Sequence, residues 1–163
     1  MLELNRISAG YGKQTVLDGI SVDFEKGKLT SIIGVNGCGK STLLKAILGI
    51  LSLSSGEIFI DGENLLTISR NEIAKKIAYL SQGKNIPDMT VEQMVLHGRF
   101  PYLSYPRRYS SHDREVAIKA METVGVAEFA HKPLYSLSGG MRQNAYIAMA
   151  LAQHTDYILL DEP

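Results

Sequence analysis

The sequence is poor in cysteine and has no excess of charge of either sign. Cys38 is the single cysteine among 163 residues, so no disulfide can form within the chain, and a reducing compartment is expected. Lys and Arg together number 17, and so do Asp and Glu. Because the charge is balanced, the chain carries no electrostatic footprint for nucleic acid or for an anionic membrane.

Long apolar runs and an apolar N-terminal signal core are also missing. No stretch approaches the ~20 apolar residues that a membrane-spanning helix needs, and the first residues are mixed in polarity. Hydrophobic residues make up 45% of the chain and charged residues 21%, which is typical of a globular domain. We therefore expect a soluble domain that reaches a membrane only through a partner.

The spacing of apolar residues predicts both strands and helices. Apolar and polar residues alternate in two segments near the N-terminus, which is typical of antiparallel strands. The predicted strands are 2–7, 15–24, 29–33, 57–60, 77–81 and 157–160, and the predicted helices are 41–48, 112–124 and 141–152, with a short helix ending at 76. Strands that alternate with helices indicate a parallel α/β core, to which the antiparallel start and a helical middle are added.

A glycine-rich segment from Gly34 to Ser41 has the spacing of a phosphate-binding loop, Gly-x-x-x-x-Gly-Lys-Ser. Glycines let backbone N–H groups approach phosphate oxygens, and the helix that follows directs its N-terminal dipole at the same anion. Lys40 would supply charge to the β and γ phosphates, and Ser41 a hydroxyl ligand for Mg²⁺. The alternative is a glycine-rich turn that caps a helix. The strand expected before the loop and the helix after it favour the phosphate loop.

Two acidic residues follow the last apolar run. In a parallel sheet the carboxyl ends of the strands face the ligand crevice. Asp161 would then lie near the Mg²⁺ held by Ser41, and Glu162 would orient or deprotonate an attacking water. The alternative is a strand that simply runs into a polar turn, but phosphoryl transfer needs both this acidic pair and the phosphate loop.

A Leu-Ser-Gly-Gly segment lies between these two sites, with Ser138 at its second position. In isolation a Ser-Gly-Gly triplet is most often a helix N-cap, although its N–H groups, hydroxyl and helix dipole also suit an anion. The order of phosphate loop, Leu-Ser-Gly-Gly and Asp-Glu-Pro resembles the ATP-binding subunits of ABC transporters over the whole chain. The resemblance implies an α/β fold: a P-loop NTPase core with an antiparallel β subdomain and an inserted helical subdomain.

The resemblance also implies roles for single residues. It implies that the Leu-Ser-Gly-Gly segment contacts the γ-phosphate of ATP bound to a second subunit, in a head-to-tail dimer. Tyr11 matches an aromatic residue that stacks on adenine, and Gln82 matches a glutamine that contacts Mg²⁺ and senses the transmembrane permease. The implied sites are ATP binding by Tyr11, Gly34, Asn36, Gly37, Cys38, Gly39, Lys40, Ser41 and Thr42, contact in trans by Ser138, Gly139 and Gly140, metal binding by Ser41, Gln82 and Asp161, and catalysis by Glu162.

The segment from His97 to Arg108 and the flanks of the phosphate loop look most like importers of iron-siderophore, haem or cobalamin complexes. The resemblance then implies a cytoplasmic subunit, peripheral on the inner face of the cell membrane and bound to permease subunits. Arg107 and Arg108 are either docking contacts or solvated surface charge. A soluble ABC-type ATPase acting on nucleic acid is a further alternative, against which the balanced charge argues.

The sequence departs from the family pattern in two places. Met141 and Asn144 stand where the family usually has glutamine and arginine. The larger departure is that the chain stops at Pro163, before the family's switch histidine. We expect the C-terminal strands of the fold to be missing and a gap in the parallel sheet, whose unpaired edges invite association. This 163-residue form would bind nucleotide with impaired or no turnover, although the full-length subunit would be an ATPase.

The predicted organisation is one incomplete ABC ATPase domain over residues 1–163. The antiparallel β part is 1–30 and 56–62, the P-loop core is 31–55, 63–86 and 141–163, and the helical subdomain with the Leu-Ser-Gly-Gly segment is 87–140.

Overall fold

The computed structural model describes residues 1–81 and 86–161, which fall into two compact units. The units are Met1–Lys76 and Ile77–Pro163. Gln82, Glu162 and Pro163 lie outside the described residues.

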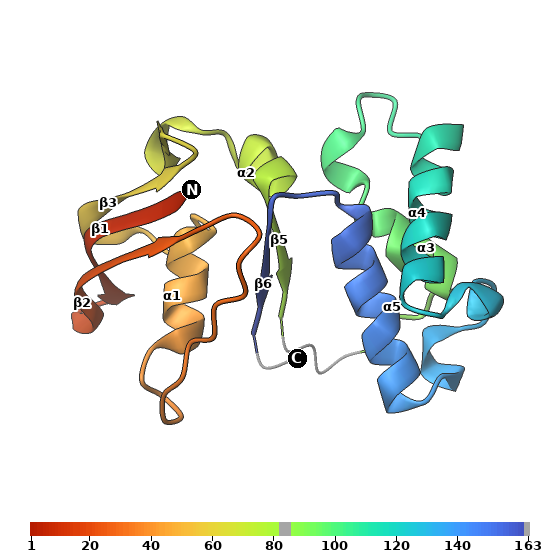
Figure 1. Cartoon of the computed structure of the whole chain (residues 1–163), viewed down its shortest axis with the longest axis horizontal. Coiled ribbons are helices and arrows are strands. Elements are labelled where there is room, and N and C mark those ends of the chain that lie inside the picture. Colours follow the sequence, from red (N-terminus) through yellow and green to blue (C-terminus); the bar gives the residue numbers. More distant parts are fainter. Residues whose placement is uncertain (82–85, 162–163) are drawn as a thin grey trace. The chain divides into compact units, whose positions relative to one another are not determined.

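The first unit is an antiparallel sheet with one helix packed on it (Figure 1). The sheet has the order β2-β1-β3-β4, and strands β1 and β2 form a hairpin. Its elements are β1 (Leu2–Tyr11), β2 (Gln14–Phe24), α1 (Lys40–Ile47), β3 (Leu53–Ile60), β4 (Glu63–Asn64), the 3-10 turn η1 (Leu65–Thr67) and α2 (Arg70–Lys76).

Alternation along β1 and β3 builds the core of this unit. Leu4 pairs with Ile58 and Leu2 with Ile60, and all four side chains are buried. Residues two apart point to the same side of a strand, so the four form one apolar face. Ile47 of α1 is buried as well. The alternating pattern of the sequence thus predicts which face of the sheet is buried.

A tight turn joins β3 to β4 and is held by charge. Ile60 pairs with Glu63 across Asp61 and Gly62, whose φ angles of 54° and 81° fit a type I′ hairpin turn. The Asp61 carboxylate accepts from the N-terminal ammonium at 2.7 Å and pairs with Lys26 at 2.9 Å. Partial burial would raise the pKa of Asp61, but these hydrogen bonds and charges lower it to about 2.

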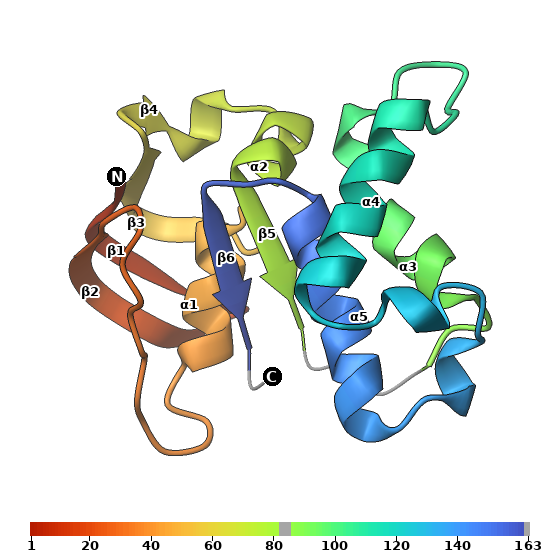
Figure 2. The same ribbon diagram turned by 45° about the vertical axis from the view of Figure 1, so that its right-hand side comes forward.

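The second unit combines a two-stranded parallel sheet with a helical cluster (Figure 2). The strands β5 and β6 pair in parallel register, from Ile77 opposite Tyr157 to Leu80 opposite Leu160. The elements are β5 (Ile77–Leu80), α3 (Val91–His97), α4 (Ser111–Thr123), α5 (Gly139–Ala152) and β6 (Tyr157–Leu160), with the 3-10 turns η2 (Phe100–Tyr102), η3 (Ala127–Phe129) and η4 (Leu134–Ser136).

Helix α5 lies against both α3 and α4, and the three share one hydrophobic core. The contact side of α5 carries small side chains, among them Ala145, Ala148 and Ala152, which are completely buried. Small residues let helices approach closely, and larger side chains from the partners, such as Val95 and Met121, fill the space. The core therefore fixes the helix that begins with the Ser-Gly-Gly triplet.

Side chains cap the N-termini of the helices in this unit. Thr90 forms a capping box with Gln93 at α3, and Ser110 forms one with Asp113 at α4. The box satisfies two backbone N–H groups that the helix itself leaves without partners. Ser138 accepts from the backbone N–H of Met141 at the start of α5. The helix predicted at 112–124 is found at Ser111–Thr123, within one residue at each end.

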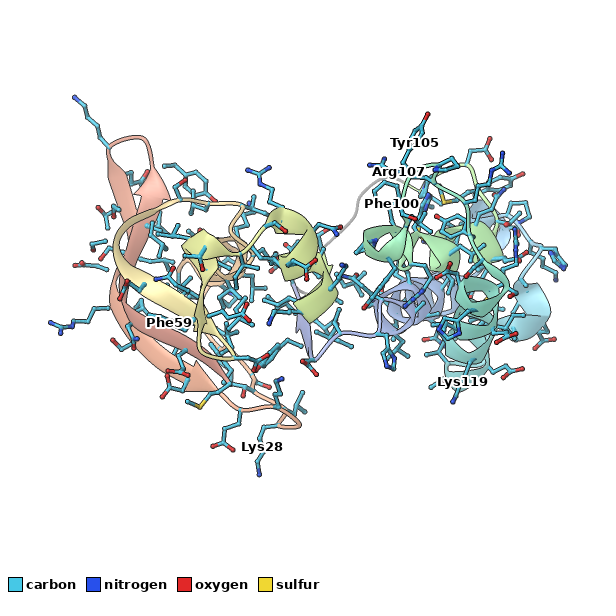
Figure 3. The ribbon with its side chains drawn as sticks, turned by 90° about the horizontal axis from the view of Figure 1, so that it is seen from above. Lys28, Phe59, Phe100, Tyr105, Arg107 and Lys119 are labelled. Atoms are coloured by element: carbon cyan, nitrogen blue, oxygen red, sulfur yellow. The ribbon has the colours of Figure 1, made fainter. Side chains whose placement is uncertain are left out.

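One end of this unit carries exposed aromatic rings and a basic side chain. Phe100, Tyr105 and Arg107 lie together there, on the side of the unit opposite to Lys119 (Figure 3). The guanidinium of Arg107 stacks on the Phe100 ring, with its central carbon 4.6 Å from the ring centroid. The exposed fraction of Tyr105 is 96%. Arg107 is exposed, and its guanidinium rests on an aromatic face.

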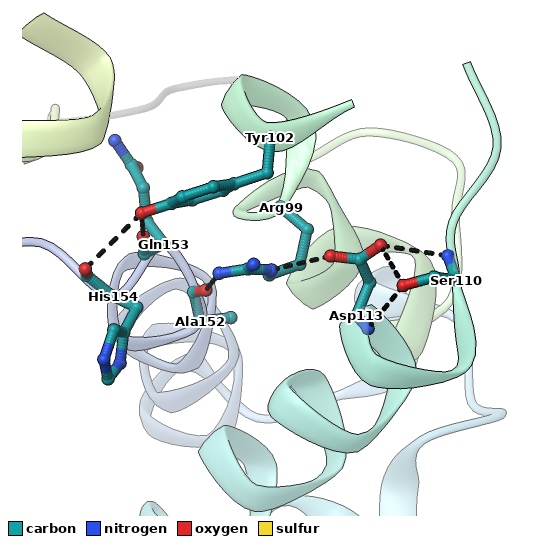
Figure 4. Close-up of polar contacts among 7 residues, drawn as sticks. All are labelled: Arg99, Tyr102, Ser110, Asp113, Ala152, Gln153 and His154. Carbon is teal, nitrogen blue, oxygen red and sulfur yellow. Dashed lines mark hydrogen bonds and ion pairs between the residues drawn. The ribbon is translucent and has the colours of Figure 1, made fainter. Parts of the chain in front are cut away.

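A buried arginine joins the ends of three helices in the same unit (Figure 4). The Nε of Arg99 donates to the Asp113 carboxylate at 3.0 Å, and one terminal nitrogen donates to the carbonyl of Ala152 at 3.0 Å. Arg99 is 6% exposed and Asp113 7%. Asp113 also accepts from the backbone N–H and the hydroxyl of Ser110. Burial would raise the pKa of Asp113, but these hydrogen bonds and the guanidinium lower it.

The C-terminus of α5 is also tied to neighbouring elements through Gln153 and Tyr102. The Tyr102 hydroxyl donates to the carbonyl of Gln153 at 2.9 Å, and its ring lies under the Arg99 guanidinium at 4.0 Å. The side-chain amide of Gln153 donates to the carbonyl of Ile77, where β5 begins. Helix α5 is thereby anchored to both the helical cluster and the parallel sheet.

Two expectations from the sequence are wrong, and one helix was not predicted. Residues 29–33 form no strand; Leu29 is 96% exposed and Ile33 93%, and no described strand pairs with them. A β-branched run becomes a strand only when a neighbouring strand accepts its hydrogen bonds. The strand at 157–160 forms as predicted, but Ile158 and Leu160 are 41% and 45% exposed, although an all-apolar run is typical of a buried strand. Helix α3 was not predicted.

Candidate nucleotide-binding site

The phosphate loop runs from Gly34 to the start of α1 in the first unit. Gly37 and Gly39 have φ angles of 81° and 101°, in the left-handed region that favours glycine. A Cβ added at Gly39 would also lie 3.1 Å from Val16 Cγ1 of the neighbouring strand β2. The loop therefore needs glycine at position 39 for its backbone angle and for its packing.

Lys40 closes the loop from the first position of α1. Its Nζ donates to the carbonyls of Gly34 at 2.9 Å and Val35 at 3.1 Å, which places the ammonium against the start of the loop. Gly39 is the N-cap of α1, and within the described residues no side chain makes a capping hydrogen bond there. No acidic residue of the described part lies in the first turn of this helix. The partial positive charge of this helix end therefore adds to the charge of Lys40. Such an end suits an anion.

The remaining loop positions differ in exposure. Asn36, Gly37 and Cys38 are exposed, whereas Ser41 is half-buried and Thr42 is buried in the first turns of α1. A Cβ added at Gly34 would lie 2.5 Å from the Cys38 sulfur. Glycine at the first position thus leaves room for the thiol side chain.

Tyr11 ends strand β1 on the side where α1 lies. Its ring is 50% exposed, and the ammonium of Lys45, in α1, lies 6.0 Å from the ring centroid. An exposed aromatic face beside the helix that follows the phosphate loop suits stacking on a planar base. The structure thus brings Tyr11 and the phosphate loop into one unit.

Asp161 directly follows β6 in the second unit. Its backbone N–H donates to the carbonyl of Leu80 at 3.0 Å, which extends the parallel pairing by one residue. Its carboxylate accepts from the hydroxyl of Tyr79 at 3.1 Å. Burial, together with the charge and hydrogen bond of Asp161, raises the pKa of Tyr79 to about 12. Tyr79 was not singled out in the sequence, although its place near the end of β5 could have suggested it.

The Ser-Gly-Gly triplet opens α5 with an accessible surface. Ser138, Gly139 and Gly140 are all exposed, and a Cβ added at either glycine would meet no atom within 4 Å. Asn144, one of the departures from the family pattern, donates to the carbonyl of Val124 at 3.0 Å. This hydrogen bond joins α5 to the C-terminal end of α4 within the second unit.

The donors present fit a hard cation bound together with a nucleotide. No group of three or more His, Cys, Asp or Glu side chains that could hold a metal occurs in residues 1–81 and 86–161. Mg²⁺ commonly binds through one or two carboxylates and through substrate phosphates, and keeps several waters. Ser41 in the first unit offers a hydroxyl and Asp161 in the second unit offers a carboxylate, each a ligand type that Mg²⁺ accepts. Gln82 and Glu162, predicted as metal ligand and catalytic residue, lie outside the described residues.

Residues 17–163 match a protein family model described as ABC transporter. The chain belongs to this family. Its phosphate loop, Leu-Ser-Gly-Gly segment and terminal acidic residues all fall inside the matched range. The predicted fold class agrees with the solved structures that resemble the chain, which are ABC ATPase cassettes.

Its relatives include proteins of iron-siderophore import. The chain is 42% identical over 163 residues to the petrobactin import ATP-binding protein FpuD of Bacillus anthracis, covering 99% of this chain and 60% of that protein. It is 41% identical over 159 residues to the ferric enterobactin transport ATP-binding protein FepC of Escherichia coli, covering 97% of this chain and 59% of that protein. A solved structure described as an inward-facing, metal-chelate type ABC transporter superposes on this chain with a TM-score of 0.84 at 32% identity. The match covers 99% of this chain and 60% of that one.

The chain spans about 60% of the length of the curated relatives it matches. In the part of the chain that the structure describes, no helix has the length and apolar character to cross a membrane.

Proposed function

We propose that this ABC family chain binds ATP with Mg²⁺ as the ATP-binding subunit of an iron-chelate importer. The phosphate loop carries the proposal: glycine angles, an uncapped helix end and the Lys40 ammonium converge on one short segment. On binding, Lys40 would exchange its contacts with loop carbonyls for contacts with the β and γ phosphates. Ser41 and Asp161 would hold Mg²⁺, which neutralises phosphate charge when bound.

The other predicted residues take roles around the nucleotide. Tyr11 would stack on adenine, and the loop N–H groups would cradle the phosphates. Glu162 would orient the attacking water in the full-length subunit, which would hydrolyse ATP. The exposed Ser138 and the two glycines after it would contact ATP on a second subunit in a head-to-tail dimer, which fits their open surroundings.

The cargo is proposed from the relatives. Petrobactin and ferric enterobactin are the cargo classes in the names of two relatives at about 40% identity. An iron-siderophore complex is therefore the proposed cargo, handled by transmembrane permease subunits. The chain would lie at the cytoplasmic face of the membrane through those subunits. The boundaries of the β part, the P-loop core and the helical subdomain stay predictions.

A specific observation favours binding without turnover for the chain as it stands. The segment before the phosphate loop pairs with no described strand, with Leu29 and Ile33 almost fully exposed, and in β6 Ile158 and Leu160 are 41% and 45% exposed. Turnover requires both the loop and the acidic strand end to act on the bound nucleotide. We expect exposed apolar segments beside these two parts to impair hydrolysis more than ATP binding, which the loop carries.

Binding of a fluorescent ATP analogue tests the proposal, with Lys40→Ala as the key variant and Lys75→Ala, a lysine of α2 that pairs with Glu72 in the same unit, as the control. Loss of charge-assisted contacts should weaken binding by about tenfold or more in Lys40→Ala and little in Lys75→Ala. Phosphate release measured in parallel separates binding from turnover. Equal affinity of Lys40→Ala and the unaltered chain would refute the nucleotide site.

A further inference from the structure

Asp161 is held at two points by strand β5. Its backbone N–H donates to the Leu80 carbonyl, and its carboxylate oxygen Oδ2 accepts from the Tyr79 hydroxyl. Tyr79 pairs with Leu159 in the parallel register, so their side chains lie on the same face of the sheet. Asp161 is two residues beyond Leu159, so its side chain lies on that face as well. A diagonal neighbour of this kind is within reach of a long aromatic side chain but not of a short one.

The direction of this hydrogen bond is fixed by chemistry. An ionised carboxylate only accepts, whereas a phenol can donate. A phenol keeps its proton at neutral pH, because its ordinary pKa is ~10. The Tyr79 hydroxyl therefore donates to Asp161 under physiological conditions. Phenylalanine would fill the same space without this bond.

We propose that Tyr79 is a positioning residue for Asp161, whose hydroxyl fixes the carboxylate in the orientation that serves nucleotide-bound Mg²⁺. The inference rests on the proposed function, because it takes Asp161 as a metal ligand. Hydrogen bonds to a ligating carboxylate orient it before the metal arrives, and losing one commonly weakens metal binding by about 10–100-fold. Tyr79 contacts neither metal nor nucleotide in this role.

A second tyrosine in the same unit provides a matched control. Tyr102 also donates from its hydroxyl, at 2.9 Å, but its acceptor is the backbone carbonyl of Gln153. Tyr79→Phe and Tyr102→Phe each remove one oxygen atom and one hydrogen bond. Only Tyr79→Phe removes a bond to a carboxylate. A general effect of losing a tyrosine hydroxyl would appear in both variants.

The experiment measures two affinities of the 163-residue chain. Affinity for an ATP analogue is measured in EDTA, and affinity for Mn²⁺, a paramagnetic substitute for Mg²⁺, is measured by EPR at saturating analogue. Tyr79→Phe should weaken Mn²⁺ binding by about tenfold and leave nucleotide affinity in EDTA unchanged. Tyr102→Phe should change neither. In an Asp161→Asn background, Tyr79→Phe should have no further effect on Mn²⁺.

The outcomes separate this inference from the function on which it rests. Unaltered Mn²⁺ affinity in Tyr79→Phe, while Asp161→Asn loses it, overturns the positioning role alone. Loss of folding, or of nucleotide affinity in EDTA, in Tyr79→Phe assigns the residue to packing and also overturns the role. Unaltered Mn²⁺ affinity in Asp161→Asn overturns the proposed metal ligand. Absence of nucleotide binding in the unaltered chain overturns the nucleotide site itself.

Discussion

At the scale of single residues, Asp61 combines a backbone requirement with an electrostatic one. Its φ of 54° suits the turn between β3 and β4, and its carboxylate receives the N-terminal ammonium and Lys26. Asparagine tolerates the same backbone angle, so Asp61→Asn removes the charge and keeps the turn. The charge and the turn can therefore be tested separately.

The pKa of Asp61 predicts a defined loss of stability in acid. It is lowered in the folded chain from 3.8 to about 2, so the carboxylate stabilises the fold above pH ~4, and this contribution is lost as the pH falls toward 2. Solvent screening limits the effect to roughly 1 kcal/mol. Urea unfolding should show Asp61→Asn less stable at pH 6, with the difference shrinking between pH 4 and pH 2. A difference that does not depend on pH would contradict the assignment.

Cys38 gives a chemical test of the phosphate loop. Its thiol is exposed and lies against Gly34, where an added Cβ would come within 2.5 Å of the sulfur. A bulky adduct on this sulfur would fill the space that the phosphates need. Alkylation should therefore abolish ATP binding, and ATP should slow alkylation, as followed by mass spectrometry. Cys38→Ser is the control that should bind ATP and resist the reagent. Equal labelling rates with and without ATP would argue against the predicted site.

At the scale of elements, the network around Arg99 holds three helix ends together. Removing one partner of a buried ion pair leaves the other charge without compensation, which commonly costs about 3–5 kcal/mol. Arg99→Ala should therefore lower the free energy of unfolding by roughly that amount. The control is Arg114→Ala, which removes an exposed contact with Glu92 at 3.5 Å and should cost under about 1 kcal/mol.

Urea denaturation of both arginine variants measures this difference. Similar destabilisation by the two substitutions would show that the buried network contributes no more than a surface pair. Because Arg99 bonds the Ala152 carbonyl, its loss should also loosen the end of α5. Amide exchange should accelerate in Arg99→Ala relative to the unaltered chain, and more so at the C-terminus of α5 than at its N-terminus.

Local sequence signals explain why some elements were predicted and others were not. Strands β1 and β2 follow from alternation, and α4 from the spacing of its apolar residues, because the signal and the structure are both local. The run at 29–33 has the composition of a strand, but whether it pairs depends on a neighbour that composition does not reveal. The Tyr79 contact with Asp161 depends on the register of two strands about 80 residues apart in the sequence, and no local pattern encodes it.

At the scale of the whole molecule, the exposed apolar segment before the phosphate loop should govern association. Leu29 and Ile33 are 96% and 93% exposed, and they lie in a stretch whose backbone pairs with no described strand. Exposed apolar side chains on an unpaired backbone favour contact with another chain. The double variant Leu29→Ser/Ile33→Ser should therefore shift the chain toward monomer, as measured by light scattering over a range of concentrations.

Stability distinguishes this effect from general unfolding. Both side chains are already in water, so the double variant should unfold at nearly the same urea concentration as the unaltered chain. Ile58→Ser, at a buried position of β3, should instead destabilise the first unit by several kcal/mol and increase association. If the double variant associates as strongly as the unaltered chain, another surface drives assembly. Strand β6 is then a further segment to test, because its Ile158 and Leu160 are 41% and 45% exposed.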